Sequence, residues 1–321
     1  MIVDVHTHFF RPELDFGSRL MADLARCGVN PAAWGDLRAR HLATTKAADV
    51  AIVFGLQAAA TGWNIPNEAV AAQVQSAPER LIFFASIDPA RPGIEEELEH
   101  NHQELHCHGV KLAPIYQGVH PLDPRYRRIY AYCQQHKLPI LIHMATTFSS
   151  GTPLEYARPA QIDQVAIDFP DLKIIMAHLG HPWEGETIAV IRRNPNVYAD
   201  LSALYYRPWQ FYNSMRLLVE YHAESKVLFG SDFPFTTTED SLKGLRNLNA
   251  VLGASGLPPI APQTIEDIIH RDALGLLGLP HPAKTEPLTG AATHGKEAEA
   301  RAQAERPDPP RADSLPQERT S

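Results

Sequence analysis

The stretch Met1-Ile-Val-Asp-Val-His-Thr-His8 opens this chain of 321 residues and decides how the rest is interpreted. Its apolar, β-branched residues predict a buried strand, on which side chains two residues apart share one face. His6 and His8 are therefore expected side by side. Histidine is the commonest metal ligand in proteins, so the pair offers two nitrogens to a divalent ion. Two half-exposed histidines at a strand end are the alternative that this stretch alone leaves open.

Seven more short apolar runs follow, separated by longer amphipathic segments. The predicted strands are residues 2–5, 50–55, 81–86, 109–112, 139–142, 173–177, 197–201 and 227–230. The predicted helices between and after them are residues 68–76, 93–105, 124–136, 158–169, 185–193, 209–223 and 239–252, the first capped by Asn67. Alternating strands and helices are typical of a parallel sheet. Eight such units predict an α/β fold, a closed TIM (β/α)8 barrel.

Three segments lie outside the regular repeat. Residues 9–45 form a very long first βα connection at the mouth of the barrel, where a lid and part of a dimer contact are both open interpretations. Residues 262–277 have the spacing of one or two closing helices. The metal-dependent barrel domain is expected over residues 1–280, and residues 281–321, rich in Ala, Glu, Arg and Pro, are expected to form a disordered tail.

The composition narrows the class of protein. Apolar residues make up 44% and charged residues 21%, as in a globular enzyme. A formal net charge of −8 argues against nucleic acid as a partner and favours a small molecule. Three cysteines without a CxxC pair indicate neither a disulfide framework nor a zinc ribbon, and fit the cytoplasm. No apolar run approaches the ~18 residues of a membrane span, so membrane insertion is not expected.

Polar residues end five of the predicted strands. In a (β/α)8 barrel the catalytic groups lie at the carboxyl ends of the strands. Those positions hold His6, His8, Lys111, His143, His178 and Asp232. Unpaired, each buried polar group would cost about 1–3 kcal/mol, a cost that a shared divalent ion removes. Imidazoles with one carboxylate and an open position are typical of a catalytic zinc site.

These residues carry a family resemblance. The His-x-His pair, the histidines after the fifth and sixth strands, and the run Gly230-Ser-Asp-Phe-Pro234 resemble the amidohydrolase superfamily. Over about residues 2–279 the chain is most similar to its amidohydrolase-related branch, which includes aminocarboxymuconate semialdehyde decarboxylase. The resemblance implies one Zn²⁺, or another divalent ion such as Mn²⁺, with His178 as the nearby acid or base. The implied metal ligands are His6, His8, His143 and Asp232.

Lys111 leaves a second metal arrangement open. Superfamily members with two metals bridge them with a carbamylated lysine on strand four, and here His143 and His178 would hold the second ion. The single-metal form is favoured because the motif runs resemble the one-metal branch. Uncarbamylated, Lys111 would face the pocket as a cation suited to a carboxylate or phenolate. The structural alternative is a lysine packed in the barrel wall and paired with a carboxylate such as Asp4.

Loops after the strands supply the expected substrate contacts. Tyr116, Trp183 and Arg207 combine aromatic rings with a cation, which suits a flat, anionic substrate. The densest histidine run, His100-Asn-His-Gln-Glu-Leu-His-Cys-His108, precedes strand four instead. Because it lies at the opposite end of the barrel from the chemistry, a solvated helix face is the expected interpretation.

Two reactions fit the predicted site. A zinc ion lowers the pKa of bound water to roughly 7, so Asp232 as proton acceptor and His178 as acid would support hydrolysis of an ester, lactone or amide. In the alternative, His178 and Asp232 protonate the carbon from which carbon dioxide leaves, as in non-oxidative decarboxylases. A non-catalytic metal-binding scaffold is the third class. A small-molecule substrate and a possible homodimer complete the expectations.

Overall fold

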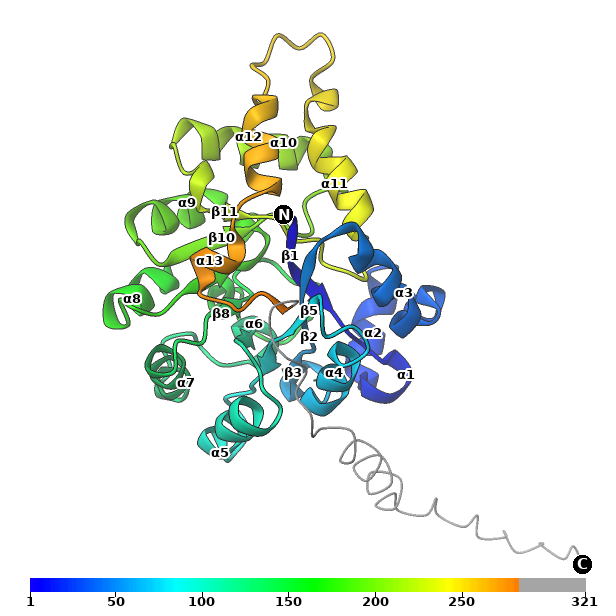
Figure 1. Cartoon of the computed structure of the whole chain (residues 1–321), viewed down its shortest axis with the longest axis vertical. Coiled ribbons are helices and arrows are strands. Elements are labelled where there is room, and N and C mark those ends of the chain that lie inside the picture. Colours follow the sequence, from blue (N-terminus) through cyan, green and yellow to red (C-terminus); the bar gives the residue numbers. More distant parts are fainter. Residues whose placement is uncertain (283–321) are drawn as a thin grey trace, which may run out of the picture. The chain divides into compact units, whose positions relative to one another are not determined.

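The chain forms a ring of parallel strands surrounded by helices (Figure 1). The structure is a computed structural model that describes residues 1–282. The predicted disordered tail falls almost wholly on residues 283–321, which lie outside the described residues. Among the described residues, no helix is long and apolar enough to cross a membrane.

The predicted strands are all present, and they close into a barrel. They are β1 (Val3–His8), β2 (Val50–Phe54), β5 (Leu81–Phe83) with β6 (Ala85–Ser86), β7 (Val110–Leu112), β8 (Ile140–Ile142), β9 (Ile174–Met176), β10 (Val197–Asp200) and β11 (Val227–Leu228). The predicted strand 81–86 changes partner at Phe84, since β5 pairs with β2 and β6 with β7. The ring closes where Val5 N donates to Phe229 O at 3.0 Å.

The predicted helices pack outside this ring. They are α4 (Asn67–Val74), α5 (Ile94–Glu99), α7 (Pro124–Gln135), α8 (Gln161–Asp168), α9 (Glu184–Arg193), α10 (Pro208–Glu220), α11 (Thr238–Arg246), α12 (Pro262–Ile269) and α13 (Ala273–Leu277). Asn67 does not cap α4 as predicted. It is the first residue of the helix, and its amide both donates to Ser86 O and accepts from Ser86 N. The buried backbone at the end of β6 needs those partners more than the helix end does.

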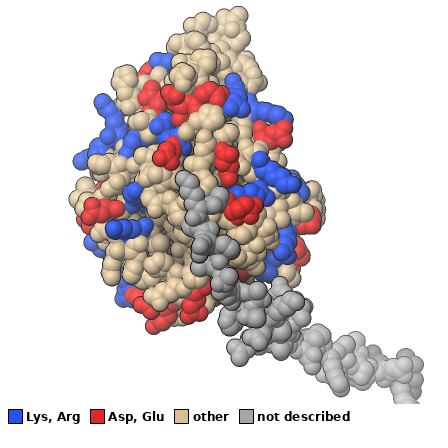
Figure 2. All heavy atoms as spheres, viewed as in Figure 1, with Lys and Arg blue, Asp and Glu red and all other residues tan. Residues whose placement is uncertain are grey.

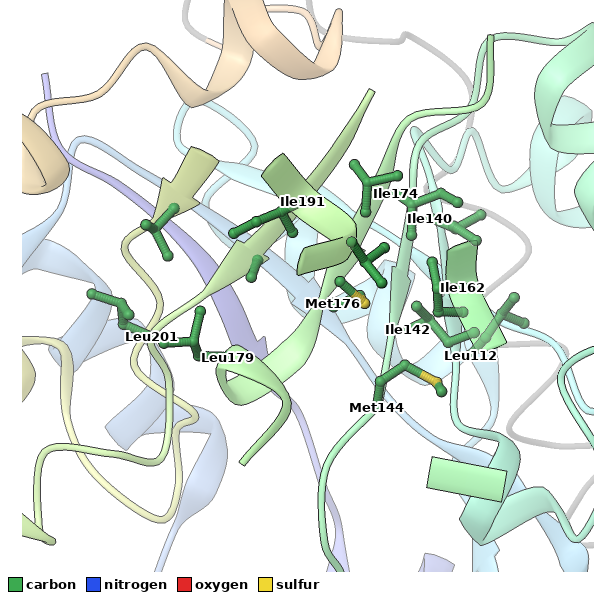
Figure 3. Packing of buried hydrophobic residues seen from close by; sticks show 14 of the residues in the cluster. Leu112, Ile140, Ile142, Met144, Ile162, Ile174, Met176, Leu179, Ile191 and Leu201 are labelled. Carbon is green, nitrogen blue, oxygen red and sulfur yellow. The ribbon is translucent and has the colours of Figure 1, made fainter. Parts of the chain in front are cut away.

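Alternation along the strands divides the core into two layers. Ile140 and Ile142 point outward into the apolar layer beneath α7 and α8, together with Ile174 and Met176 of β9 (Figure 3). Leu141 points inward and packs against other barrel residues above α13. Lys111 follows the inward pattern, because it pairs with Leu141 across the sheet. A lysine inside the barrel is the first sign of a polar centre there.

The long first connection covers the mouth of the barrel. It folds into α1 (Pro12–Asp15), α2 (Ser18–Arg26), a 3₁₀ turn at Pro31–Trp34 and α3 (Leu37–Thr44). Two arginines of α2 fasten the loop after β8: Arg26 donates to Phe148 O at 2.6 Å and Arg19 to Ser150 O at 2.5 Å. The covering role is therefore the one that the structure shows, and the dimer contact stays a prediction.

Candidate metal centre and its cavity

A bulge in β1 aims both strand histidines into the barrel. Asp4 pairs with Ala51 and Thr7 with Val53, so Val5 and His6 together oppose the single residue Ile52. The extra residue lets an apolar side chain and His6 share the inner face, and the normal period of two then returns His8 to it. Bulges commonly redirect side chains beside active sites in this way.

Three ligand atoms meet at the end of this strand. His6 Nε2 and His8 Nε2 lie 3.2 Å apart, and each is 3.3 Å from Oδ1 of Asp232. Atoms that share one ion at about 2.0–2.2 Å lie roughly 3.0–3.5 Å from one another. Two nitrogens with a carboxylate oxygen at this spacing fit a divalent cation. His6, His178 and Asp232 also form a group whose ligand atoms all lie within 4.8 Å of one another.

The electrostatics agree with a cation site. Burial lowers the pKa of His6, His8 and His178 well below 6.5, so all three are neutral imidazoles that can ligate a metal. Burial raises the pKa of Asp232 well above its usual 3.8. A divalent ion would reverse that shift because it favours the charged carboxylate.

Asp200 supports the site from behind, and sequence reasoning missed it. It is fully buried at the end of β10, and its Oδ2 accepts a hydrogen bond from His6 Nδ1 at 2.8 Å. This bond leaves the Nε2 lone pair of His6 free for the metal. Asp200 is the polar residue at the end of the seventh strand, so the rule that selected the other strand-end residues could have found it.

His178 is held in place by the same carboxylate. Its backbone N–H donates to Asp200 Oδ1 at 3.0 Å. Ser202 Oγ donates to that oxygen at 2.5 Å and therefore accepts from His178 Nδ1 at 2.7 Å. The lone pair of His178 is thus on Nε2. Because His178 adopts the left-handed backbone region, at φ 60° and ψ 29°, its position depends on these contacts.

His143 lies beside His178 but faces differently. The two ring centroids are 4.9 Å apart. His143 Nε2 lies 3.1 Å from the carbonyl oxygens of Ala145 and Thr146, so this nitrogen carries the hydrogen. Only Nδ1 has a lone pair to offer a metal. The place of His143 among the ligands therefore stays a prediction.

Lys111 reaches the centre from the opposite wall. Its side chain is 1% exposed, and its Nζ lies 3.5 Å from His6 Nε2 and 4.5 Å from the centre of the Phe54 ring. The alternative pairing with Asp4 is wrong, because the carboxylates that act on the charge of Lys111 are Asp200 and Asp232, while the Asp4 oxygens accept bonds from Ser231 N and Thr238 Oγ1. Burial lowers the pKa of Lys111 to about 7.

A cavity of about 530 Å³ opens above the metal group. Its polar lining includes His8, Lys111, His143, His178, His181, Arg207 and Asp232, and its aromatic lining is Phe10, Trp63, Tyr116, Phe148, Tyr206 and Phe235. Tyr116 and Arg207 therefore lie where substrate contacts were predicted. Trp183 does not line the cavity, contrary to prediction. Its ring packs instead beneath the Arg158 guanidinium, 5.5 Å away.

Comparison with known proteins identifies the class. A model of the amidohydrolase family matches residues 3–279, and the chain belongs to that family. No match was found among curated proteins. The family match agrees with the metal-site motif at the ends of the strands and with the barrel fold.

Solved structures show the same fold. An uncharacterized TIM-barrel protein from Bordetella bronchiseptica has a TM-score of 0.67 at 23% identity, covering 88% of this chain and 99% of that one. Dihydroxybenzoic acid decarboxylase from a Polaromonas species, with bound manganese and an inhibitor, has a TM-score of 0.59 at 16% identity, covering 86% and 96%. A probable 2-pyrone-4,6-dicarboxylic acid hydrolase from Acinetobacter baumannii, with citric acid bound, has a TM-score of 0.56 at 15% identity, covering 87% and 99%.

Proposed function

We propose that the chain is a metal-dependent hydrolase acting on a small, carboxylated aromatic or conjugated ester, lactone or amide. The observation that carries the proposal is the place of Asp232, whose Oδ1 lies 3.3 Å from both strand histidines while the side chain lines the cavity. One carboxylate can then help to hold the ion and accept a proton from water. The chemistry that zinc supplies when bound is activation of water, whose pKa it lowers to roughly 7.

The neighbouring residues divide the proton handling. His178 begins with its lone pair on Nε2, because Nδ1 donates to Ser202. It therefore first takes over the proton that Asp232 accepts from water, since the two groups lie within 4.8 Å of each other, and then passes it to the leaving group as that group departs. The carboxylate of Asp200 stabilises the positive charge that this transfer places on the His178–Ser202 unit.

The cavity lining supports an anionic, flat substrate. Arg207 provides a cation, Lys111 with a pKa of about 7 becomes one beside a bound anion, and Tyr116 and Trp63 provide ring faces. Arg207 is held by a hydrogen bond to Ala203 O at 2.6 Å and lies over the Tyr206 ring at 4.5 Å. A guanidinium fixed in this way suits a carboxylate.

Decarboxylation is the second candidate. Arg207 and Lys111 could hold an aromatic acid while His178, after taking up a proton from solvent at Nε2, gives that proton to the ring carbon as the bond to carbon dioxide breaks. The similar Polaromonas protein is a dihydroxybenzoic acid decarboxylase. Asp232 has a role in either reaction, as acceptor of the water proton in hydrolysis or with His178 in protonating the carbon, so the products of the reaction must separate the two candidates.

One screen separates these functions. The chain loaded with zinc, and separately with manganese, is incubated with lactones, esters, amides and aromatic acids, and the products are identified by mass. Addition of one water to a lactone or ester supports the proposal, and loss of carbon dioxide from an acid with no hydrolysis overturns it.

His178→Asn is the control for a non-catalytic scaffold, which would lose nothing measurable. Two metal equivalents per chain would contradict the single-metal site.

A further inference from the structure

His181 and Glu184 form a second polar pair in the cavity wall that the reaction above does not use. His181 lines the cavity, and both residues are buried, at 9% and 8% exposure. His181 Nδ1 lies 2.6 Å from Glu184 Oε1, and Ser214 Oγ donates to the same oxygen at 3.0 Å. A buried carboxylate that accepts two hydrogen bonds is held in a defined position, unlike a surface carboxylate that water solvates.

The remaining polar atoms of His181 are accounted for, except one. Its backbone N–H donates to His178 O at 3.0 Å, and its carbonyl accepts from Thr146 N at 2.8 Å. Nδ1 faces Glu184. Within residues 1–282, Nε2 has no hydrogen-bond partner. It is not one of the described polar atoms that are both unpartnered and completely buried, so it remains accessible. Nε2 is therefore the atom of His181 that can meet a ligand in the cavity.

The state of Glu184 fixes which hydrogen His181 carries. Burial acts to raise the pKa of Glu184, but the hydrogen bonds from His181 and Ser214 outweigh it and hold the pKa below its usual 4.5. An ionised carboxylate can only accept, so His181 donates through Nδ1–H. The lone pair of the neutral ring then stands on Nε2. Carboxylates orient histidines in this way in many active sites.

We propose that His181, oriented by Glu184, is a specificity-determining residue whose Nε2 accepts a hydrogen bond from a hydroxyl group of the substrate. The inference rests on the proposed function, because it takes the substrate to be a small aromatic or conjugated acid. Lys111 and Arg207 recognise the carboxylate, which every such acid has, whereas His181 recognises the hydroxyl, which only some have. Lining the same cavity as the two cations, His181 adds the selection that charge alone does not provide.

The test compares hydroxylated and plain acids on the same protein. The full chain, loaded with manganese, is titrated with benzoate and with 2-, 3- and 4-hydroxybenzoate, and Kd is measured by calorimetry. At least one hydroxybenzoate should bind about 10-fold or more tightly than benzoate. His181→Phe should abolish that advantage, so that benzoate and the hydroxybenzoates bind with the same Kd, whereas the exterior variant His270→Phe should retain the advantage.

Two further measurements keep the test decisive. Glu184→Gln preserves the shape of the pair, and should reduce the hydroxyl advantage because the neutral amide polarises the imidazole less. Nitrogen-15 shifts of His181, assigned by their loss in His181→Phe, should show hydrogen on Nδ1 and not on Nε2 in the free protein. Hydrogen on Nε2, or an undiminished hydroxyl advantage in His181→Phe, overturns the inference. Equal binding of all four acids overturns the inference on His181 and leaves the proposed function standing. Binding of none of them overturns the proposed substrate class as well.

Discussion

Two histidine-rich regions of this molecule differ in their location and in the partners of their imidazoles. His6 and His8 lie inside the barrel, where Asp232 contacts both of them and Asp200 contacts His6. The run from His100 to His108 lies on and after the helix before β7, and α5 continues there as a π-helical segment, His100–Glu104. His106 follows that segment, at φ 56°, so the expectation of a helix face is wrong for this residue.

The partners of the two regions explain the difference. In the exterior run, His100 Nδ1 lies 3.0 Å from the exposed carboxylate of Glu104, and His102 Nδ1 lies 3.1 Å from the Tyr132 hydroxyl. Water can replace such partners at little cost. In the barrel, both imidazoles are buried, and a buried carboxylate, Asp200, fixes the ring of His6. Burial with an orienting partner, and not histidine density, therefore marks the candidate metal centre.

The largest expected effect comes from removing Asp232, the carboxylate that contacts both barrel histidines and has no counterpart among the described residues of the exterior run. Asp232→Asn should lower metal affinity and kcat/KM by more than about 100-fold, because the loss of a ligand should exceed the 10- to 100-fold that outer partners contribute. Metal content by mass spectrometry and turnover of the substrate found in the screen measure both effects. A fully metal-loaded, active Asp232→Asn protein would show that the ion is held elsewhere.

The next effect tests the support behind His6. Asp200→Asn should lower metal affinity about 10- to 100-fold, since the neutral amide no longer orients and polarises the imidazole. Glu104→Gln is the matched control, because it removes the carboxylate bonded to His100 in the exterior run. Competition with a chelator measures both variants. Equal affinities would remove the distinction drawn between the two regions.

The sequence predicted the barrel well because its apolar runs alternate so regularly. It also placed the strand-end residues at one end of the barrel, since parallel strands share that edge. It could not predict the β1 bulge, whose register depends on β2, or the packing of Trp183 beneath Arg158. The pairing of His181 with Glu184 was not predicted either, because it depends on how the loop after β9 folds. Contacts between loops depend on tertiary geometry that local patterns do not carry.

A third buried histidine extends the comparison to stability. His41 is fully buried, its Nε2 lies 3.0 Å from Thr7 Oγ1, and its Nδ1 accepts from Gln73 Nε2 at 3.3 Å. Burial, with a smaller contribution from Arg80, lowers the pKa of His41 to about 3. The unfolded chain binds this proton near pH 6.5, so the stability from a neutral His41 is present above pH 6.5 and is lost as the pH falls toward 3.

Urea unfolding at several pH values measures that contribution. His41 should account for up to about 1.4 kcal/mol of lost stability per pH unit below 6.5, and His41→Gln should show a correspondingly shallower slope. The comparison uses slopes because the variant also loses native contacts at every pH. Identical slopes would mean that His41 is not held neutral by its surroundings.

The smallest expected effect belongs to the exterior run. His102 lies near His136, with ring centroids 5.2 Å apart, but within the described residues no carboxylate completes a compact three-ligand group with them. His102→Ala should therefore leave turnover and the tightly bound metal unchanged, and should remove only weak binding that appears at high metal concentration. Calorimetric titration of wild type, His102→Ala and Asp232→Asn assigns each equivalent to its region. If the tight equivalent vanished in His102→Ala and persisted in Asp232→Asn, the exterior run would be the metal site, and burial with an orienting carboxylate would not be what selects it.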